Sequence, residues 1–349
     1  MQVERGEGDV ETTYSALISY VKDIQHLNQS SAAALLVLQD DRIVFEHYDG
    51  FHSNHDSKVV DVNSMFNVAS ARKSYLGLAI AYALYEGKIR HLDDLVSDYF
   101  DEYDVGTFRG TTIRHLVTHS HGLNQDETGL VFREFDAGEG WAYQGVNVEI
   151  VTNLFKRLYG YDFTHLLRER VFQPMGLSRT EWATRAAPSL VKVVDVPDEE
   201  ASYKLYPFDD GMGSNLHTTA REFAAWGNLH LNNGRHRGVQ IVPEEVIRLA
   251  TSIQSPEYAN STFPTNGLFW YVQGVPKAWS ELGEAVPTGS YQILGNTGPL
   301  LLVIPAYRAV VVRMYNKRYN YGGDRYLDYL REFSNLAAET LRPTDNPIP

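Results

Sequence analysis

The chain has 349 residues, of which 43% are hydrophobic and 12% aromatic, so it can bury a large core in one domain or in two fused parts. Lys and Arg number 31 against 44 Asp and Glu, giving a formal charge of −13, and the lack of a Lys/Arg cluster argues against nucleic acid as a partner. The chain contains no cysteine, which excludes disulfides, thiolate nucleophiles and cysteine-ligated zinc.

The N-terminal segment, residues 1–15, is polar and acidic and has no basic flank leading into an apolar run. No later stretch approaches the ~20 apolar residues that a membrane span needs. We therefore expect a cytoplasmic protein without a membrane span. A chain trimmed of an export signal would have the same appearance.

The first predicted element is a β-hairpin at residues 31–50, where two strand-like runs flank the turn pair Asp40 and Asp41. A helix is predicted next, over residues 69–89, because apolar residues recur there at three- and four-residue spacing. Gly87 stands where a C-terminal cap belongs. The helix is apolar on most of its surface, so we expect it to be buried.

Helical and loop patterns dominate from about residue 92 to residue 237. They include a helix in which Thr219 and Glu222 have the spacing of a capping box. Strand character returns afterwards, and an amphipathic helix closes the pattern. Strands near both chain ends must then pair with each other across the helical middle. The predicted C-terminal strands are at 287–295, 299–305 and 308–316, and the closing helix is at 325–341.

No repeat, low-complexity segment or linker interrupts the chain, so we expect one domain over residues 1–349. Its α/β part is predicted at about 14–91 and 238–342. A mostly helical part is predicted at about 92–237, and residues 343–349 are expected to form a frayed tail.

Ser70 and Lys73 stand three residues apart at the head of the buried helix, so their side chains share a face and can approach to hydrogen-bonding distance. A serine hydroxyl becomes a good nucleophile only when a base takes its proton. A lysine serves as that base when burial and a neighbouring positive charge or dipole lower its pKa. Taken alone, this short spacing is more often a surface serine beside a solvent-reaching lysine.

The sequence around Ser70 and Lys73 favours a catalytic pair over a surface serine and lysine. Residues 62–100 resemble the active-site helix of the serine β-lactamase and penicillin-binding-protein superfamily, especially its class C branch with esterase and amide-hydrolase relatives. Three later segments resemble further elements of the same branch in the same order. They lie at 111–123, 140–160 and 172–182.

This resemblance implies an α+β fold of the β-lactamase/transpeptidase type. An antiparallel sheet from both chain ends would be flanked by helices, with a mostly helical second part and the site between them. Carried over by position, Ser70 is the acylated nucleophile, Lys73 its proton acceptor and Tyr143 a tyrosine that relays protons. Lys73 and Tyr143 should titrate as a coupled pair, and either could take the first proton.

The sequence departs from the family's second motif, because Gly145 stands where the family has an asparagine two residues after the tyrosine. The amide that usually helps to hold the lysine and the substrate carbonyl is therefore missing. Gln144 and Asn147 are candidates to replace it, and we predict Gln144 as a substrate-binding residue.

The third motif, normally a lysine or histidine followed by Thr-Gly, also differs. Gly295 and Asn296 occupy this place on the strand that lines the site, and we predict both as substrate-binding residues. In one alignment the backbone N–H of Asn296 completes the oxyanion hole with that of Ser70. In the other, the Asn296 side chain replaces the cationic residue. Neither alignment puts a positive charge there.

His115, His119 and His121 form a cluster that could be mistaken for a metal site. No acidic or cysteine ligand pattern accompanies them, so we expect packing and capping groups, with no metal and no other cofactor.

Three functions remain open from the sequence. The first is a serine hydrolase that forms an acyl-enzyme at Ser70 and acts on an ester, amide or peptide-like bond of a small molecule. The second is a true β-lactamase or D-alanyl carboxypeptidase, which the missing cation disfavours. The third is a non-catalytic, ligand-binding relative, favoured by Gly145 and disfavoured by the joint presence of Ser70, Lys73 and Tyr143.

Overall fold

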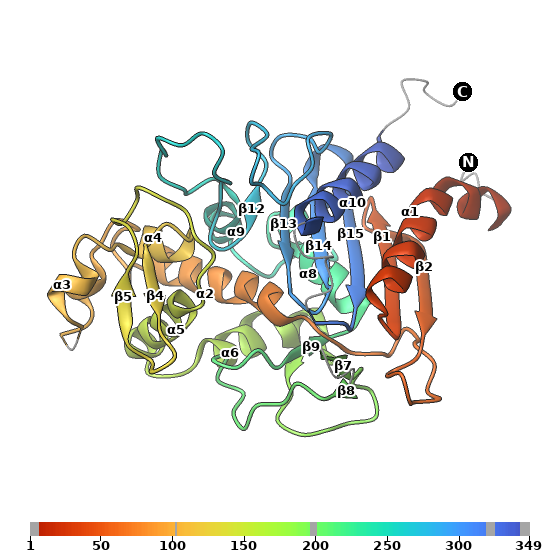
Figure 1. The fold of residues 1–349 in the computed structure, drawn as a ribbon, viewed down its shortest axis with the longest axis horizontal. Helices are drawn as coiled ribbons and strands as arrows, with labels where there is room; N and C mark the ends of the chain where they lie inside the picture. The colour runs from red at the N-terminus through yellow and green to blue at the C-terminus, as the bar shows by residue number, and fades with distance from the viewer. Residues whose placement is uncertain (1–6, 102, 196–200, 319–324, 343–349) are drawn as a thin grey trace.

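The computed structural model describes residues 7–101, 103–195, 201–318 and 325–342. At its centre is an antiparallel six-stranded sheet in the order β12-β13-β14-β15-β1-β2 (Figure 1). Ala33 of the first strand lies opposite Tyr315 of the last, so the predicted sheet from both chain ends is confirmed. The strands are β1 (Ala32–Gln39), β2 (Arg42–Gly50), β12 (Tyr271–Val272), β13 (Tyr291–Leu294), β14 (Leu300–Ile304) and β15 (Ala309–Tyr315).

The hairpin between β1 and β2 turns on the two predicted residues. Asp40 and Asp41 have φ values of 49° and 64°, in the left-handed region. Two consecutive left-handed residues match the twist of a two-residue hairpin, and aspartate tolerates this conformation better than most residues. The predicted hairpin is confirmed.

Helices cover both faces of the sheet, so both faces of its central strands are buried. Leu36 of β1 packs in a core shared with α8 (Ala220–Leu231), while its neighbour Leu35 packs in a second core with α1 (Glu7–Asn28) and α10 (Tyr326–Leu341). Helices α1 and α10 lie side by side on that second face (Figure 1). This double burial explains why β1 is an almost unbroken apolar run.

Helix α1 was not predicted from the sequence. Its buried residues Tyr14, Leu17, Val21 and Ile24 recur at three- and four-residue spacing and face the sheet. Polar residues dominate the rest of the 22-residue helix and conceal this stripe. The helix therefore depends on packing against the sheet.

Helix α2 (Lys73–Tyr85) begins beside the sheet and runs into the helical part (Figure 1). All of its residues from Lys73 to Ala83 are buried, as predicted. The Tyr75 ring stacks on Trp226 of α8, with centroids 4.0 Å apart. Gly87 follows the last turn with a φ of 70°, the conformation expected of the predicted cap.

Helix α8 lies on the sheet, although the sequence analysis placed it in the helical part. A Cβ on Gly227 would come within 2.7 Å of Val310, so this glycine lets the helix approach β15 closely. At its N-terminus the Thr219 side chain accepts the Glu222 N–H, as predicted. The Glu222 carboxylate does not complete the box, because it accepts the backbone N–H of Ser178 instead.

The middle of the chain contains short strands as well as the expected helices. The structure describes a three-stranded sheet in the order β3-β9-β6 and the pairs β4-β5, β7-β8 and β10-β11. The strands are β3 (Phe66–Asn67), β4 (Leu123–Gln125), β5 (Val131–Arg133), β6 (Glu181–Trp182), β7 (Val193–Val194), β8 (Ala201–Ser202), β9 (Leu216–Thr218), β10 (Arg235–His236) and β11 (Val239–Gln240). The remaining helices are α3 (Val105–Phe108), α4 (Ile113–Val117), α5 (Val146–Tyr159), α6 (Phe163–Leu167), α7 (Gln173–Met175) and α9 (Glu244–Thr251).

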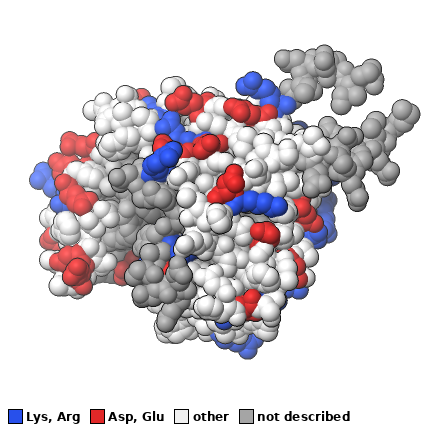
Figure 2. Space-filling model, turned by 45° about the vertical axis from the view of Figure 1, so that its right-hand side comes forward, with Lys and Arg blue, Asp and Glu red and all other residues white. Residues whose placement is uncertain are grey.

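Acidic and basic side chains lie interspersed on the face shown in Figure 2. Across the described segments, none of the helices combines the length and apolarity required to cross a bilayer. The predicted tail, 343–349, lies outside the described residues.

Candidate active site

Ser70 lies in a short 3₁₀ turn, Ala69–Arg72, that leads directly into α2. Ala69 has a φ of 44°, a left-handed conformation that a residue with a Cβ adopts only at a cost. The Asn67 side chain accepts the Ala69 N–H at 3.1 Å and donates to the Ser214 carbonyl at 2.7 Å. Side-chain hydrogen bonds thus hold the strained turn that presents Ser70.

The structure brings the three predicted catalytic residues together. Lys73 Nζ lies 3.2 Å from Ser70 Oγ and 2.5 Å from the phenol oxygen of Tyr143. The Tyr143 residue is 44% exposed, yet its phenol oxygen reaches the buried lysine. One amine therefore contacts both hydroxyl groups.

Tyr143 is positioned mainly by His119. The two rings stack with centroids 4.7 Å apart, and the Ala142 N–H donates to the His119 carbonyl at 3.0 Å. Burial lowers the pKa of His119 well below its ordinary value, and the nearby Lys73 lowers it further. His119 therefore contributes an uncharged ring on which the Tyr143 ring stacks.

Lys73 is only 4% exposed. Burial lowers its pKa well below the usual value, the Arg72 guanidinium lowers it further, and Glu281 opposes both effects. Burial also raises the pKa of Tyr143 to about 12, partly offset by a hydrogen bond with Ser70. The lowered pKa of Lys73 favours the free amine, which is the form that accepts a proton, while the raised pKa of Tyr143 favours retention of its phenol proton.

The loop after β13 is fastened to the serine turn. A Cβ on Gly295 would lie 2.2 Å from the Val68 carbonyl oxygen, so only glycine fits there. Two residues later, Thr297 Oγ1 donates to the Asn67 carbonyl at 2.9 Å. The third-motif segment therefore packs directly against the backbone that carries Ser70.

Two residues that line the pocket around Ser70 Oγ have backbone N–H groups without a partner in the described part of the chain. Within the described residues, neither the Ser70 N–H nor the Asn296 N–H has a hydrogen-bond acceptor. Gly295 and Asn296 both line the same pocket as Ser70. Unpaired amides at a nucleophile are what an oxyanion needs, which fits the first of the two predicted alignments.

The pocket has a volume of about 270 Å³ and opens over Ser70 and Lys73. Its walls are mostly aromatic and aliphatic, and its size suits a small molecule. The Trp141 indole is fixed in the wall by a 2.9 Å hydrogen bond to Asn266 Oδ1. The apolar and aromatic wall residues are Trp141, Phe269, Tyr271, Ile293, Leu294 and Tyr326.

Glu281 also lines the pocket and was missed in the sequence analysis. It is 8% exposed, and its Oε2 has no hydrogen-bond partner within the described residues. Burial raises the pKa of Glu281 to about 8, while a hydrogen bond with Tyr271 and the nearness of Lys73 lower it. A lone glutamate in an irregular segment carries no sequence signal, because a solvated loop has the same pattern.

The two residues considered as replacements for the missing asparagine point elsewhere. Gln144 Nε2 lies 3.2 Å from a carboxylate oxygen of Glu134, on the outside of the protein. Asn147 donates to the Leu116 carbonyl at 2.7 Å, and neither side chain lines the pocket. A Cβ on Gly145 would meet nothing within 4 Å, so the place of the family's asparagine is open space.

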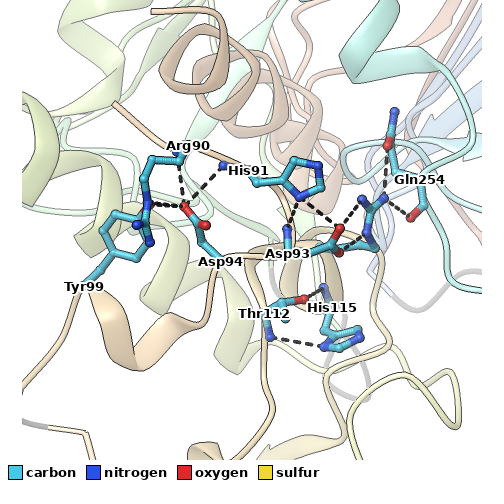
Figure 3. Close-up of polar contacts among 9 residues, drawn as sticks. Arg90, His91, Asp93, Asp94, Tyr99, Thr112, His115 and Gln254 are labelled. Atoms are coloured by element: carbon cyan, nitrogen blue, oxygen red, sulfur yellow. Dashed lines mark hydrogen bonds and ion pairs between the residues drawn. The ribbon is translucent and has the colours of Figure 1, made fainter. Parts of the chain in front are cut away.

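The other two histidines of the predicted cluster cap local structure. His115 Nδ1 accepts the Thr112 N–H at 3.1 Å and closes the capping box of α4 (Figure 3). His121 Nδ1 accepts the Leu123 N–H at 3.0 Å. Within the described part of the chain, His, Asp and Glu side chains form no group of three or more suited to a metal ion.

Sequence comparison identifies similar proteins over nearly the whole chain. A family model described as Beta-lactamase matches residues 19–335. An uncharacterised protein of Alkalihalophilus pseudofirmus is 38% identical over 329 residues, which cover 94% of this chain and 96% of that relative.

Solved structures of similar fold superpose on nearly the whole chain. A class C beta-lactamase superposes with a TM-score of 0.78 and 15% identity, over 99% of both chains. EstCE1, described as a hydrolase with promiscuous acyltransferase activity, superposes with a TM-score of 0.71 and 16% identity, over 92% of this chain and 99% of that one. At such low identity the likeness establishes a shared fold. The predicted α+β class is confirmed.

The raised pKa of Glu281 predicts a pH-dependent stability change for Glu281→Gln. The carboxyl titrates near 4.5 when unfolded and at about 8 when folded, so it costs the wild type increasing stability as pH rises through that window. Glutamine has no proton to lose. We expect Glu281→Gln to be more stable relative to wild type at pH 8 than at pH 5, by on the order of 1 kcal/mol or more, measured by denaturant unfolding.

Glu284→Gln is the matched control, because Glu284 lies in the same segment with a 74% exposed side chain. Its carboxylate is in water and pairs with Arg331 at 3.1 Å, so we expect the effect of this change to differ less between the two pH values than that of Glu281→Gln. An equal effect of Glu281→Gln at pH 5 and pH 8 would contradict the protonated, buried carboxyl.

Proposed function

The chain belongs to the beta-lactamase family, and on that basis we propose that it is a serine hydrolase forming an acyl-enzyme at Ser70. It would act on an ester, amide or peptide-like bond of a small molecule. The observation that carries the proposal is the 3.2 Å approach of the buried Lys73 amine to Ser70 Oγ, next to two unpaired backbone amides.

In the proposed acylation, Lys73 takes the Ser70 proton while Oγ attacks the substrate carbonyl carbon. The N–H groups of Ser70 and Asn296 stabilise the oxyanion that develops. Lys73 then passes the proton through the Tyr143 phenol, 2.5 Å away, to the leaving oxygen or nitrogen. This order follows from the pKa directions, because Tyr143 holds its proton more firmly than Lys73 does.

Deacylation uses the same groups in reverse. A water molecule attacks the acyl carbon and gives its proton to the Tyr143 and Lys73 pair, and Ser70 recovers its proton as the acid leaves. The small pocket restricts the acyl and leaving groups to small molecules.

We further propose that uncharged esters or amides are preferred to β-lactams. The carboxylate of a penicillin or cephalosporin normally meets a cation on the lining strand, but here Leu294, Gly295 and Asn296 occupy that wall. Losing such a charge-assisted hydrogen bond costs about 1.5 to 3 kcal/mol. Above about pH 8, the ionised Glu281 would disfavour an anionic substrate further.

The role of Ser70 is tested by Ser70→Ala. Turnover of small acyl esters should fall at least about a thousandfold because the covalent step is lost, while the unfolding midpoint stays close to that of wild type. A serine-directed phosphonate should label wild type at Ser70, as located by mass spectrometry. Labelling of a different serine, or no labelling of folded wild type, would favour a non-catalytic, ligand-binding protein.

Shared proton handling predicts non-additive effects of Lys73→Met and Tyr143→Phe. Each single change should reduce kcat/KM severely, and the double change should be little worse, because the two groups act as one unit. A double-mutant cycle with an ester substrate measures this. Additive losses would mean that the two residues act in separate steps.

The substrate preference is tested by comparing kcat/KM for p-nitrophenyl butyrate and nitrocefin on one preparation. We expect the ester to be the better substrate, and Asn296→Lys to raise the nitrocefin value about 10-fold or more by restoring a cation. Efficient hydrolysis of nitrocefin together with negligible ester hydrolysis would make the protein a true β-lactamase.

A further inference from the structure

A buried carboxyl group faces the pocket without a complete set of partners. Glu281 lines the cavity, is more than nine-tenths buried and leaves Oε2 without a hydrogen bond within the described residues. Its backbone is held in place, because Gln292 Nε2 donates to the Glu281 carbonyl at 3.1 Å. A buried carboxyl oxygen without a partner is costly, and a ligand group that pairs with it would remove that cost.

Aromatic rings surround the space that this carboxyl faces. Trp141, Tyr143, Tyr271 and Tyr326 line the same pocket as Glu281. The Trp141 and Tyr271 rings lie 6.2 Å apart and are inclined at 53°, which forms a corner in the wall. Aromatic faces attract cations, most strongly where water is excluded.

The pocket offers little competing positive charge. Lys73 is the only Lys or Arg among the described residues that line it, and burial favours its neutral form. An arriving cation therefore meets a carboxyl group and aromatic faces, and the charge of Arg72 lies behind the described lining residues and not among them. The formal charge of −13 adds long-range attraction for cations.

We propose that this pocket selects substrates that carry an ammonium group, bound between Glu281 and the aromatic wall while the acyl carbon reaches Ser70. The inference rests on the proposed hydrolase function and specifies the substrate class of that same site. Contact with the cation compensates the carboxylate of Glu281, and a hydrophobic ammonium such as a trimethylammonium group also suits the rings.

The ionisation of Glu281 is coupled to binding. The groups that face it are Lys73 at the start of α2, Tyr271 on β12, Tyr143 before α5 and Tyr326 on α10. The empty pocket favours the protonated carboxyl, and a bound cation favours the carboxylate with release of that proton to solvent. Affinity for a permanent cation should therefore rise as pH increases through about 8, the pKa of Glu281 in the empty pocket.

The test compares choline with 3,3-dimethylbutan-1-ol, two alcohols of nearly the same shape, of which only choline is charged. Binding to the Ser70→Ala protein is measured by titration calorimetry at pH 9, where Glu281 is ionised. We expect choline to bind about tenfold more tightly than the neutral alcohol. This preference should shrink at pH 6.5.

Glu281→Gln should remove most of the preference for choline, whereas the exposed control Glu284→Gln should keep it. The comparison of the two alcohols needs no change at Glu281, so the inference stays testable even if Glu281→Gln fails to fold. Equal affinity of the two alcohols at pH 9, or an unchanged preference in folded Glu281→Gln, would overturn it.

A second measurement separates this inference from the proposed function. In wild type at pH 9, choline should compete with p-nitrophenyl butyrate at a concentration about tenfold lower than the neutral alcohol needs. If wild type hydrolyses no ester and no phosphonate labels Ser70, the proposed function fails while the calorimetric result still decides the inference. If the ester is hydrolysed and both alcohols compete equally, the hydrolase function stands and the ammonium preference is wrong.

Discussion

The amine of Lys73 is almost entirely removed from water and lies within reach of two hydroxyl groups, Ser70 Oγ and the Tyr143 phenol. Keeping a lysine there as a charged group would cost several kcal/mol of lost hydration without a close anion. The neutral form avoids most of that cost and is also the form that can accept a proton. The burial of α2 on all sides therefore builds the core and also lowers the pKa of the proposed base.

Two charged neighbours, Arg72 and Glu281, shift the pKa of Lys73 in opposite directions. Arg72 lies one residue before it and donates to the carbonyl oxygens of Ala69 and Met212, so its positive charge is held close to the amine. That charge lowers the lysine pKa, while Glu281 raises it. Because Lys73 and Glu281 are both buried, the neutral amine and the neutral carboxyl group are favoured together. In the proposed function, a charged ligand would perturb both groups at once, and substrate charge would thereby be coupled to the protonation of Lys73.

The proposed oxyanion site depends on a contact between distant parts of the chain. Thr297 and Asn67 are 230 residues apart, and their hydrogen bond fixes the loop after β13 to the serine turn. Gly295 permits this approach because any Cβ would collide with the Val68 carbonyl. The sheet built from both chain ends is what brings the Ser70 and Asn296 amides into one pocket.

The elements that could be predicted are those with a local signal. The hairpin at Asp40 and Asp41, the buried helix α2 and the C-terminal strands follow from turn residues and apolar spacing, and the Ser70 to Lys73 spacing is itself local. Helix α1 was not predicted because polar residues conceal its apolar stripe. Glu281 could not be found from its own segment, since only tertiary packing places it beside Lys73.

The departures from the family's motifs change the polarity of the pocket. The lining strand carries no cation, Gly145 leaves open space where the family has a polar amide, and Glu281 adds a carboxyl group to the aromatic lining. Any one of these changes alone could be read as decay of an active site. Decay does not explain why Ser70, Lys73 and Tyr143 keep hydrogen-bonding geometry or why the Ser70 and Asn296 amides stay unpaired. Together, the hydrogen-bonded geometry at Ser70 and the altered pocket lining support the proposed hydrolase with a changed substrate over a loss of catalysis.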